Sequence, residues 1–189
     1  VLLAQRALEV RDNALQMAKL LYDPPELLMV DPQEQYRHTL RQHAFDFVAT
    51  LPHHAYEKLA QQRKSSLPQK KLLQELTTYA TSLPIDYGSS ILVRAVESNI
   101  QLLRVLILGP DDTPYANGCF VFDVYLPDYP NKPPLVKFLT TGQGKYRLNP
   151  NLYNDGKVCL SLLGTWAGPG WQRGESTLLQ VLVSIQSLT

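Results

Sequence analysis

Cysteine is scarce in this sequence of 189 residues, which holds only Cys119 and Cys159. Two cysteines cannot form a framework of several disulfides, and neither has a histidine near it in the sequence to complete a structural zinc site. A reducing compartment fits this composition best. We therefore expect a protein of the cytoplasm, with the nucleus as an alternative.

Long apolar runs and an excess of one charge are also missing. No stretch approaches the roughly 20 apolar residues that span a bilayer, and the first residues do not combine a basic stretch with an apolar one. Lys and Arg number 18 against 17 Asp and Glu, which gives a net charge of +1. Because so balanced a chain has no strong attraction for polyanions, we expect protein partners, and neither nucleic acid nor membrane.

The sequence has no initial Met and no stop signal at its end. It begins at Val1, and the apolar helix predicted over its last residues reaches Thr189 without a Gly or Pro. We therefore expect a fragment of a longer protein from which C-terminal helices are missing. Its length accommodates one domain of about 120 to 150 residues and an extension.

Residues 1–67 are predicted to form a helical N-terminal extension. Apolar side chains recur there at helical spacing, and further helices are predicted over residues 32–49 and 54–62. All four histidines lie in this part, and no two of them stand four residues apart on one helix face. We expect solvated or partly packed imidazoles rather than a metal site. The four are His38, His43, His53 and His54.

Residues 68–189 have a different texture and are predicted to form the core domain. A helix is expected over residues 68–82, and a second helix begins near Ser176 after a long irregular loop over residues 140–174. Between the first helix and the loop come four short β-branched or aromatic runs, at residues 91–96, 102–108, 119–126 and 135–139. Adjacent short strands favour an antiparallel meander. We therefore predict an α+β fold: a four-stranded antiparallel meander with an N-terminal helix and a helix after the loop, preceded by the helical extension.

The long loop contains the motif with the clearest chemistry. Residues 149–160 read Asn-Pro-Asn-Leu-Tyr-Asn-Asp-Gly-Lys-Val-Cys-Leu, in which Asn-Asp-Gly favours a tight turn directly before Cys159. Composition alone does not make this thiol a nucleophile, because a Cys between Val and Leu is more often an inert buried side chain.

Four segments in this order resemble the ubiquitin-conjugating enzyme family. They are Gly-Pro-Asp-Asp-Thr-Pro-Tyr-Ala-Asn-Gly at 109–118, Leu-Pro-Asp-Tyr-Pro-Asn-Lys-Pro-Pro at 126–134, Asn-Pro-Asn at 149–151, and Val-Cys-Leu at 158–160. The resemblance covers residues 68–189, and its details are most similar to the large atypical members, such as the giant inhibitor-of-apoptosis type called BRUCE or Apollon.

The resemblance implies a cysteine acyltransferase that needs no cofactor. Cys159 would accept ubiquitin or a ubiquitin-like protein as a thioester from an activating enzyme, and would pass it to a lysine amine of a substrate held by a ligase. Another protein's C-terminus must therefore reach the Cys159 sulfur. Asn151 matches the family Asn that stabilises the oxyanion or holds the loop in shape. Asn149 stands where the family usually has His, which puts the loop geometry in doubt more than the nucleophile.

The resemblance also implies surfaces for partners. Lys70 and Lys71, on the first family helix, would meet the activating enzyme. The residues that would contact a ligase are Tyr129, Asn131, Lys132, Pro133, Trp166 and Pro169. Trp171 would either join them or cap the core, and Cys119 is expected to be structural.

Two other functions remain open at this point. One is a catalytically inactive domain of the same fold that acts as a binding or scaffold module. The other is a cysteine hydrolase, which needs a histidine base, and every histidine lies far before Cys159 in the sequence, in the predicted extension.

Overall fold

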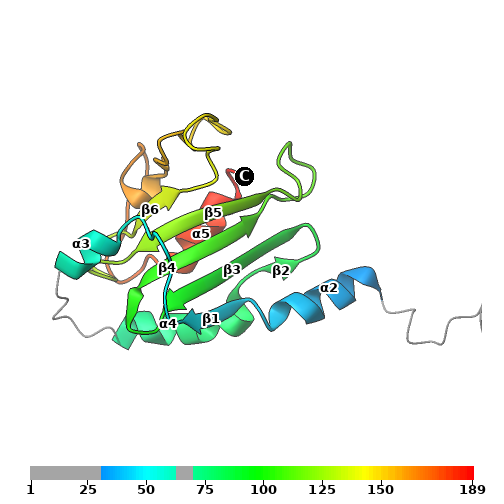
Figure 1. Ribbon diagram of the computed structural model, residues 1–189, viewed down its shortest axis with the longest axis horizontal. Coiled ribbons are helices and arrows are strands. Elements are labelled where there is room, and N and C mark those ends of the chain that lie inside the picture. Colours follow the sequence, from blue (N-terminus) through cyan, green and yellow to red (C-terminus); the bar gives the residue numbers. More distant parts are fainter. Residues whose placement is uncertain (1–30, 63–69) are drawn as a thin grey trace, which may run out of the picture. The chain divides into compact units, whose positions relative to one another are not determined.

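The computed structural model describes residues 31–62 and 70–189, and its sheet lies in one compact unit, Tyr36–Thr189 (Figure 1). The four central strands are β3 (Ser89–Val96), β4 (Asn99–Leu108), β5 (Cys119–Tyr125) and β6 (Leu135–Phe138). Each pairs antiparallel with the next, which confirms the predicted meander and the α+β class. One row across the sheet runs through Val93, Val105, Phe122 and Phe138, all of them buried.

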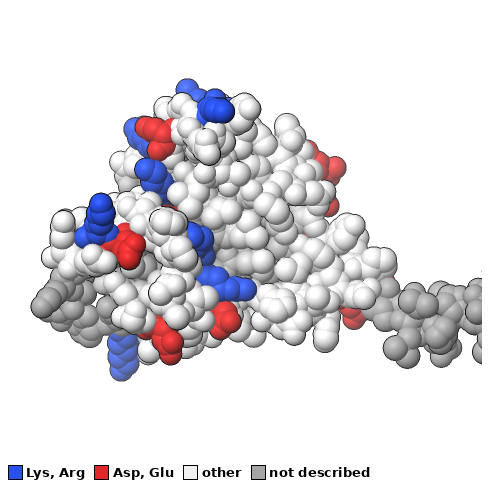
Figure 2. Space-filling view, viewed as in Figure 1, with Lys and Arg blue, Asp and Glu red and all other residues white. Residues whose placement is uncertain are grey.

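Alternate side chains of these strands point to one face, where they form the main core with two helices. Helix α4 (Lys70–Ser82) adds Leu72, Leu76 and Tyr79, and helix α5 (Leu178–Gln186) adds an apolar stripe. Thr177 starts α5 with a capping box closed by Gln180, which explains why the helix begins there. Burying each large apolar side chain contributes roughly 1.5–3 kcal/mol. Charged side chains of both signs lie on the surface seen in Figure 2.

The region before α4 differs from the predicted helical extension. The helix expected over residues 32–49 ends early, as α2 (Pro32–Arg41), and is followed by strand β1 (Phe45–Val48). β1 pairs parallel with β3 and extends the sheet. Strand β1 thus belongs to the compact unit, which begins at Tyr36, ahead of the boundary expected after residue 67. The physical reason is that Phe-Asp-Phe-Val suits a strand, and the edge of β3 offers it backbone partners.

The segment that follows β1 covers the second face of the sheet. It includes α3 (Glu57–Gln62), and its Ala60 packs in a small cluster with Val96, Leu102 and Tyr125. Burial and the nearby Asp123 carboxylate raise the pKa of Tyr56 to about 12. This segment is therefore part of the folded domain.

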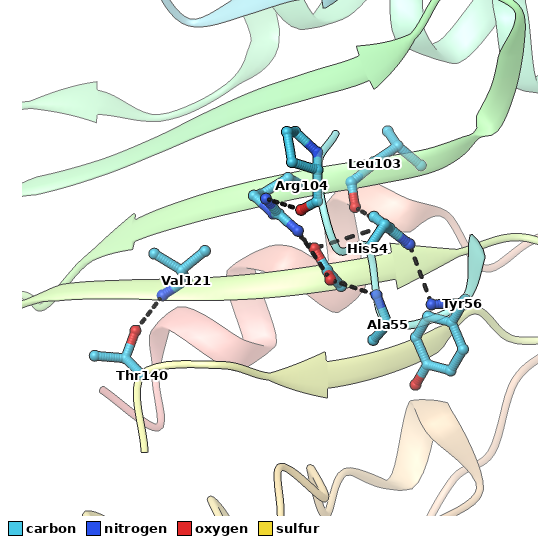
Figure 3. A network of polar contacts seen from close by, with 9 residues as sticks. His54, Ala55, Tyr56, Leu103, Arg104, Val121 and Thr140 are labelled. Atoms are coloured by element: carbon cyan, nitrogen blue, oxygen red, sulfur yellow. Dashed lines mark hydrogen bonds and ion pairs between the residues drawn. The ribbon is translucent and has the colours of Figure 1, made fainter. Parts of the chain in front are cut away.

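A buried charge pair fastens this segment to the sheet (Figure 3). The fully buried Asp123 carboxylate accepts hydrogen bonds from Arg104 at 2.7 and 3.1 Å and from the Ala55 amide at 2.7 Å. The His54 ring accepts from the Tyr56 amide at Nδ1, 3.2 Å, so Nε2 is the nitrogen that donates to the Leu103 carbonyl at 2.9 Å.

Among the residues described, no helix combines the length and the apolar character needed to cross a membrane.

Candidate active site

Residues 149–159 fold back on themselves as a short antiparallel pair that ends at Cys159. Leu152 is bridged to Val158, the Cys159 amide donates to the Asn151 carbonyl at 2.8 Å, and the Tyr153 amide donates to the Lys157 carbonyl at 2.9 Å. The turn requires glycine at position 156, where φ is 90° and a Cβ would lie 2.7 Å from the Phe138 carbonyl oxygen. The structure therefore contains the tight turn predicted before Cys159.

This pairing determines which way the side chains face. Leu152 and Val158 belong to the main core. Because neighbouring side chains in a paired segment alternate between faces, the residues on either side of them face away from that core. Those residues are Asn151, Tyr153 and Lys157, whereas Cys159, the residue after Val158, is itself buried.

The Cys159 thiol is nevertheless covered. The residue is only 2% exposed, whereas Cys119 is exposed. The chain after Cys159 turns through the short helix η2 (Ser161–Leu163) and returns, so that the Thr165 hydroxyl donates to the Val158 carbonyl at 2.7 Å and accepts from the Leu160 amide at 2.9 Å. These bonds lie on both sides of Cys159 in the sequence. We therefore expect access to the sulfur to require movement of this returning segment.

The side-chain amide of Asn151 is bonded to the backbone of Cys159. Its Nδ2 donates to the Cys159 carbonyl oxygen at 2.9 Å, which joins the two ends of the pair. Asn149, in the position usually held by His, accepts from the Asn151 amide through its own side chain at 2.7 Å. The side-chain amide of Asn149 thus closes the loop locally. The Nδ2 group of Asn151 has two N–H donors, and the bond to the Cys159 carbonyl uses one of them.

The predicted partner residues divide into two groups. Lys70 and Lys71 at the start of α4 share a cavity of about 480 Å³ with Tyr129 and Asn131. Arg173 also lines this cavity, and sequence reasoning missed it; its place in the Gly-rich loop, two residues after Trp171, was the available signal. The remaining predicted residues do not line it: Lys132 pairs with Asp128 at 3.7 Å, Pro133 is half-buried, and Trp166 and Pro169 are exposed.

Glu75 of α4 is a second residue that sequence reasoning missed. Its carboxylate accepts from the Tyr79 hydroxyl at 2.8 Å, from the Leu179 amide at 3.1 Å, and from the Tyr129 hydroxyl. Burial and Glu75 together raise the pKa of Tyr129 above its usual range. One carboxylate therefore joins α4, the loop at Tyr129 and the first turn of α5.

Trp171 connects the two loops proposed to contact a ligase. Its indole Nε1 donates to the Pro130 carbonyl at 2.9 Å, and its ring meets that of Tyr129 edge-on. The residue is half-buried, so it joins two loops and packs on the core.

None of the histidines in the described residues is arranged as a base for Cys159. His54 is buried on the other face of the sheet with both ring nitrogens engaged, and His38, His43 and His53 are exposed. Within the same residues, no group of three His, Cys, Asp or Glu could hold a metal ion. The geometry thus offers no support for a cysteine hydrolase.

Comparisons with known proteins agree with this architecture. Residues 71–189 match the family model described as ubiquitin-conjugating enzyme. The human "Dual E2 ubiquitin-conjugating enzyme/E3 ubiquitin-protein ligase BIRC6" is 47% identical over 176 residues, which cover 91% of this chain and 3% of that protein. The "Probable ubiquitin-conjugating enzyme protein 17" of Caenorhabditis elegans is 52% identical over 122 residues, 63% of this chain and 17% of that protein.

A solved structure gives the same assignment. The ubiquitin-conjugating enzyme E2 of Plasmodium falciparum has a TM-score of 0.50 and 28% identity, and the match covers 63% of this chain and 95% of that one. The chain spans only a small part of the length of the curated relatives named above. Because the family model covers well over half of its residues, this chain belongs to the ubiquitin-conjugating enzyme family.

Proposed function

We propose that Cys159 carries ubiquitin or a ubiquitin-like protein as a thioester and transfers it to a lysine amine. The observation that carries the proposal is the hydrogen-bonded pair that ends at Cys159 and holds the Asn151 amide on the Cys159 carbonyl. A thioester retains acyl-transfer reactivity and is tolerably stable to water, so a thiol suits a group that is passed between proteins.

The reaction has two steps. The Cys159 thiolate attacks the C-terminal carbonyl carbon of the activated ubiquitin, and the thiolate of the activating enzyme leaves. A neutral lysine amine then attacks the new thioester, the Cys159 thiolate leaves, and an amide bond forms after the nitrogen loses a proton. The second N–H of Asn151 is the donor available to an oxyanion in this step.

The cavity at the start of α4 is the proposed contact with the activating enzyme and a ligase. Three cations, Lys70, Lys71 and Arg173, line it together with Tyr129 and Asn131. Positive charge favours acidic groups of a partner and speeds association. The exposed Trp166 and Pro169 would add a separate apolar contact.

A second candidate function is a binding or scaffold module that forms no thioester. The observation that favours it is the 2% exposure of Cys159. A thiol that stays covered cannot meet the C-terminus of another protein.

A gel assay distinguishes the two functions. The protein is incubated with ubiquitin, ATP and each activating enzyme in turn, and the products are separated without reducing agent. We expect a shifted band that thiols remove, that is absent from Cys159→Ala and that persists in Cys119→Ser. This pair is a matched control because the chain has only these two cysteines. Absence of the band with every activating enzyme would favour the binding module.

A further inference from the structure

Two cationic side chains lie over the Tyr153 ring, close in the chain to the proposed thioester site, and a third lies beside one of them. The Arg147 guanidinium carbon lies 4.1 Å from the centre of the Tyr153 ring, and the Lys157 ammonium lies 5.7 Å from it. Lys137 is the antiparallel bridge partner of Lys157, and its side chain passes over Gly156. All three cations are exposed. We call Lys137, Arg147 and Lys157 the basic cluster.

Figure 2 shows where Lys and Arg atoms lie on one face of the molecule. Lys and Arg atoms gather at the top of the view, where Figure 1 draws the chain that follows β6, and Asp or Glu atoms are fewer there. The nearest acidic residue in the sequence, Asp155, uses Oδ1 to accept from the Lys157 amide at 2.9 Å. Within residues 31–62 and 70–189, no ion pair engages any member of the basic cluster.

Repulsion among the positive charges of the basic cluster destabilises the folded protein. Like charges directly opposite one another in an antiparallel pair repel, as Lys137 and Lys157 do. The Tyr153 ring offsets part of this cost through its negative face. Arg147 is also fixed by a hydrogen bond to the Pro150 carbonyl at 2.6 Å, which leaves most of its guanidinium donors free. Such a surface attracts anions. Its cations are already held close together before an anion binds, which lowers the cost of binding.

The basic cluster lies close to Cys159 in a defined direction. Along the hydrogen-bonded pair, Tyr153 is two residues from Asn151, and Lys157 is two residues from Cys159. Two residues of extended chain span roughly 7 Å. A substrate segment whose lysine reaches Cys159 would therefore place the side chains a few residues away over the basic cluster.

We propose that the basic cluster binds an acidic segment of the substrate protein, with Asp or Glu within a few residues of the acceptor lysine. This proposal rests on the proposed function and specifies which lysines the enzyme modifies. The attraction acts between the guanidinium or ammonium groups and the substrate carboxylates, and the bound segment directs its lysine toward the thioester.

Discharge to two synthetic peptides tests the proposal. Each peptide carries one lysine, flanked on both sides by Glu in the first and by Gln in the second. The charged enzyme is mixed with both, and the ratio of the two products is measured, so that any general change in activity cancels. We expect the wild type to favour the acidic peptide by about 3- to 10-fold at low salt, and less as salt is added.

The variant Lys137→Gln/Lys157→Gln should reduce this ratio to about one. The control Arg37→Gln/Lys58→Gln removes the same charge from exposed positions outside the basic cluster and should keep the ratio. A wild type without preference, or a preference that survives in Lys137→Gln/Lys157→Gln, would overturn the proposal.

Failure of the wild type to form a thioester with any activating enzyme would overturn the proposed function itself, and with it this inference. A phosphoserine peptide preferred well above the Glu peptide would reassign the surface to phosphate and overturn the choice of carboxylates.

Discussion

Asn151 is the residue whose side chain is held closest to the proposed chemistry. Its Nδ2 bonds the Cys159 carbonyl, and its backbone amide is held by the Asn149 side chain. Asn149 therefore supports Asn151 directly, which explains how the loop keeps its shape without the usual His. The same geometry combines both roles considered for Asn151, because an amide that holds the loop still has one N–H for an oxyanion.

Replacing Asn151 by Ala should leave charging intact and slow discharge to free lysine by about 100-fold or more, since one oxyanion donor is lost. Single-turnover discharge of the thioester measures this. Asn154→Ala is the control, because that amide lies in the same loop and bonds the Gly144 carbonyl instead. Unchanged discharge in Asn151→Ala would leave Asn151 with the loop-holding role alone.

Among the elements, we expect the segment that returns from η2 to control access to Cys159. The Thr165 hydroxyl bonds the backbone at Val158 and Leu160, and thereby holds this segment against the two neighbours of the cysteine. A hydrogen bond of this kind is worth about 0.5–1.5 kcal/mol. Local opening is therefore within easy reach of thermal fluctuation, and a partner that binds the segment could favour the open state.

Removing the Thr165 hydroxyl should expose Cys159 more often. In a Cys119→Ser background, Thr165→Val is expected to raise the rate of iodoacetamide alkylation at Cys159 by about 3- to 10-fold, as the lost hydrogen bond predicts. Mass spectrometry of the labelled protein measures the rate. Thr165→Ser keeps the hydroxyl and should label as slowly as the parent. Equal rates in the two variants would mean that another contact covers the thiol.

The elements that the sequence predicted correctly are those with a local pattern. The alternation of Phe120, Phe122 and Val124 is a property of neighbouring residues, and it is enough to predict β5 and its buried face. Strand β1 escaped prediction because only four residues form it and its partner, β3, lies almost fifty residues away. Tertiary pairing decides such a segment, and a helical reading of its neighbours hides it.

The same distinction applies to the site. Cys159 and Asn151 lie eight residues apart within one motif, so the motif alone is enough to predict that they belong to one site. Tyr129 lines the cavity proposed to contact a ligase, and its hydroxyl is bound to Glu75, 54 residues earlier. No pattern of neighbouring residues predicts a contact between side chains so far apart in the sequence. Cys159 is buried, and a thiol between Val and Leu already favoured that position.

At the scale of the whole molecule, the sheet is a layer with cover on both faces. The main core with α4 and α5 covers one face, and residues 51–60 cover part of the other. The contact on this second face depends on charge as well as apolar area. Asp123 is fully buried, so its carboxylate is stable there only while Arg104 and the Ala55 amide satisfy it.

Arg104→Ala should therefore destabilise the protein far more than loss of an exposed pair. Removing one partner of a buried pair costs roughly 3–5 kcal/mol, and because the Arg104 side chain is 26% exposed, we expect the lower end of that range in urea unfolding. Arg37→Ala breaks an exposed pair with Asp86 and should cost about 0–1 kcal/mol.

The part of the protein that Arg104→Ala destabilises is as informative as the size of the destabilisation. Arg104 also donates to the Pro52 carbonyl, so its removal should speed amide hydrogen exchange first in residues 51–60, while β4 and β5 stay protected. That result would mean that the segment opens from the second face as a unit and leaves the main core on the other face intact. Exchange that rises equally in all strands would instead mean that the segment and the sheet unfold together, because the segment would then be as essential to the domain as the main core.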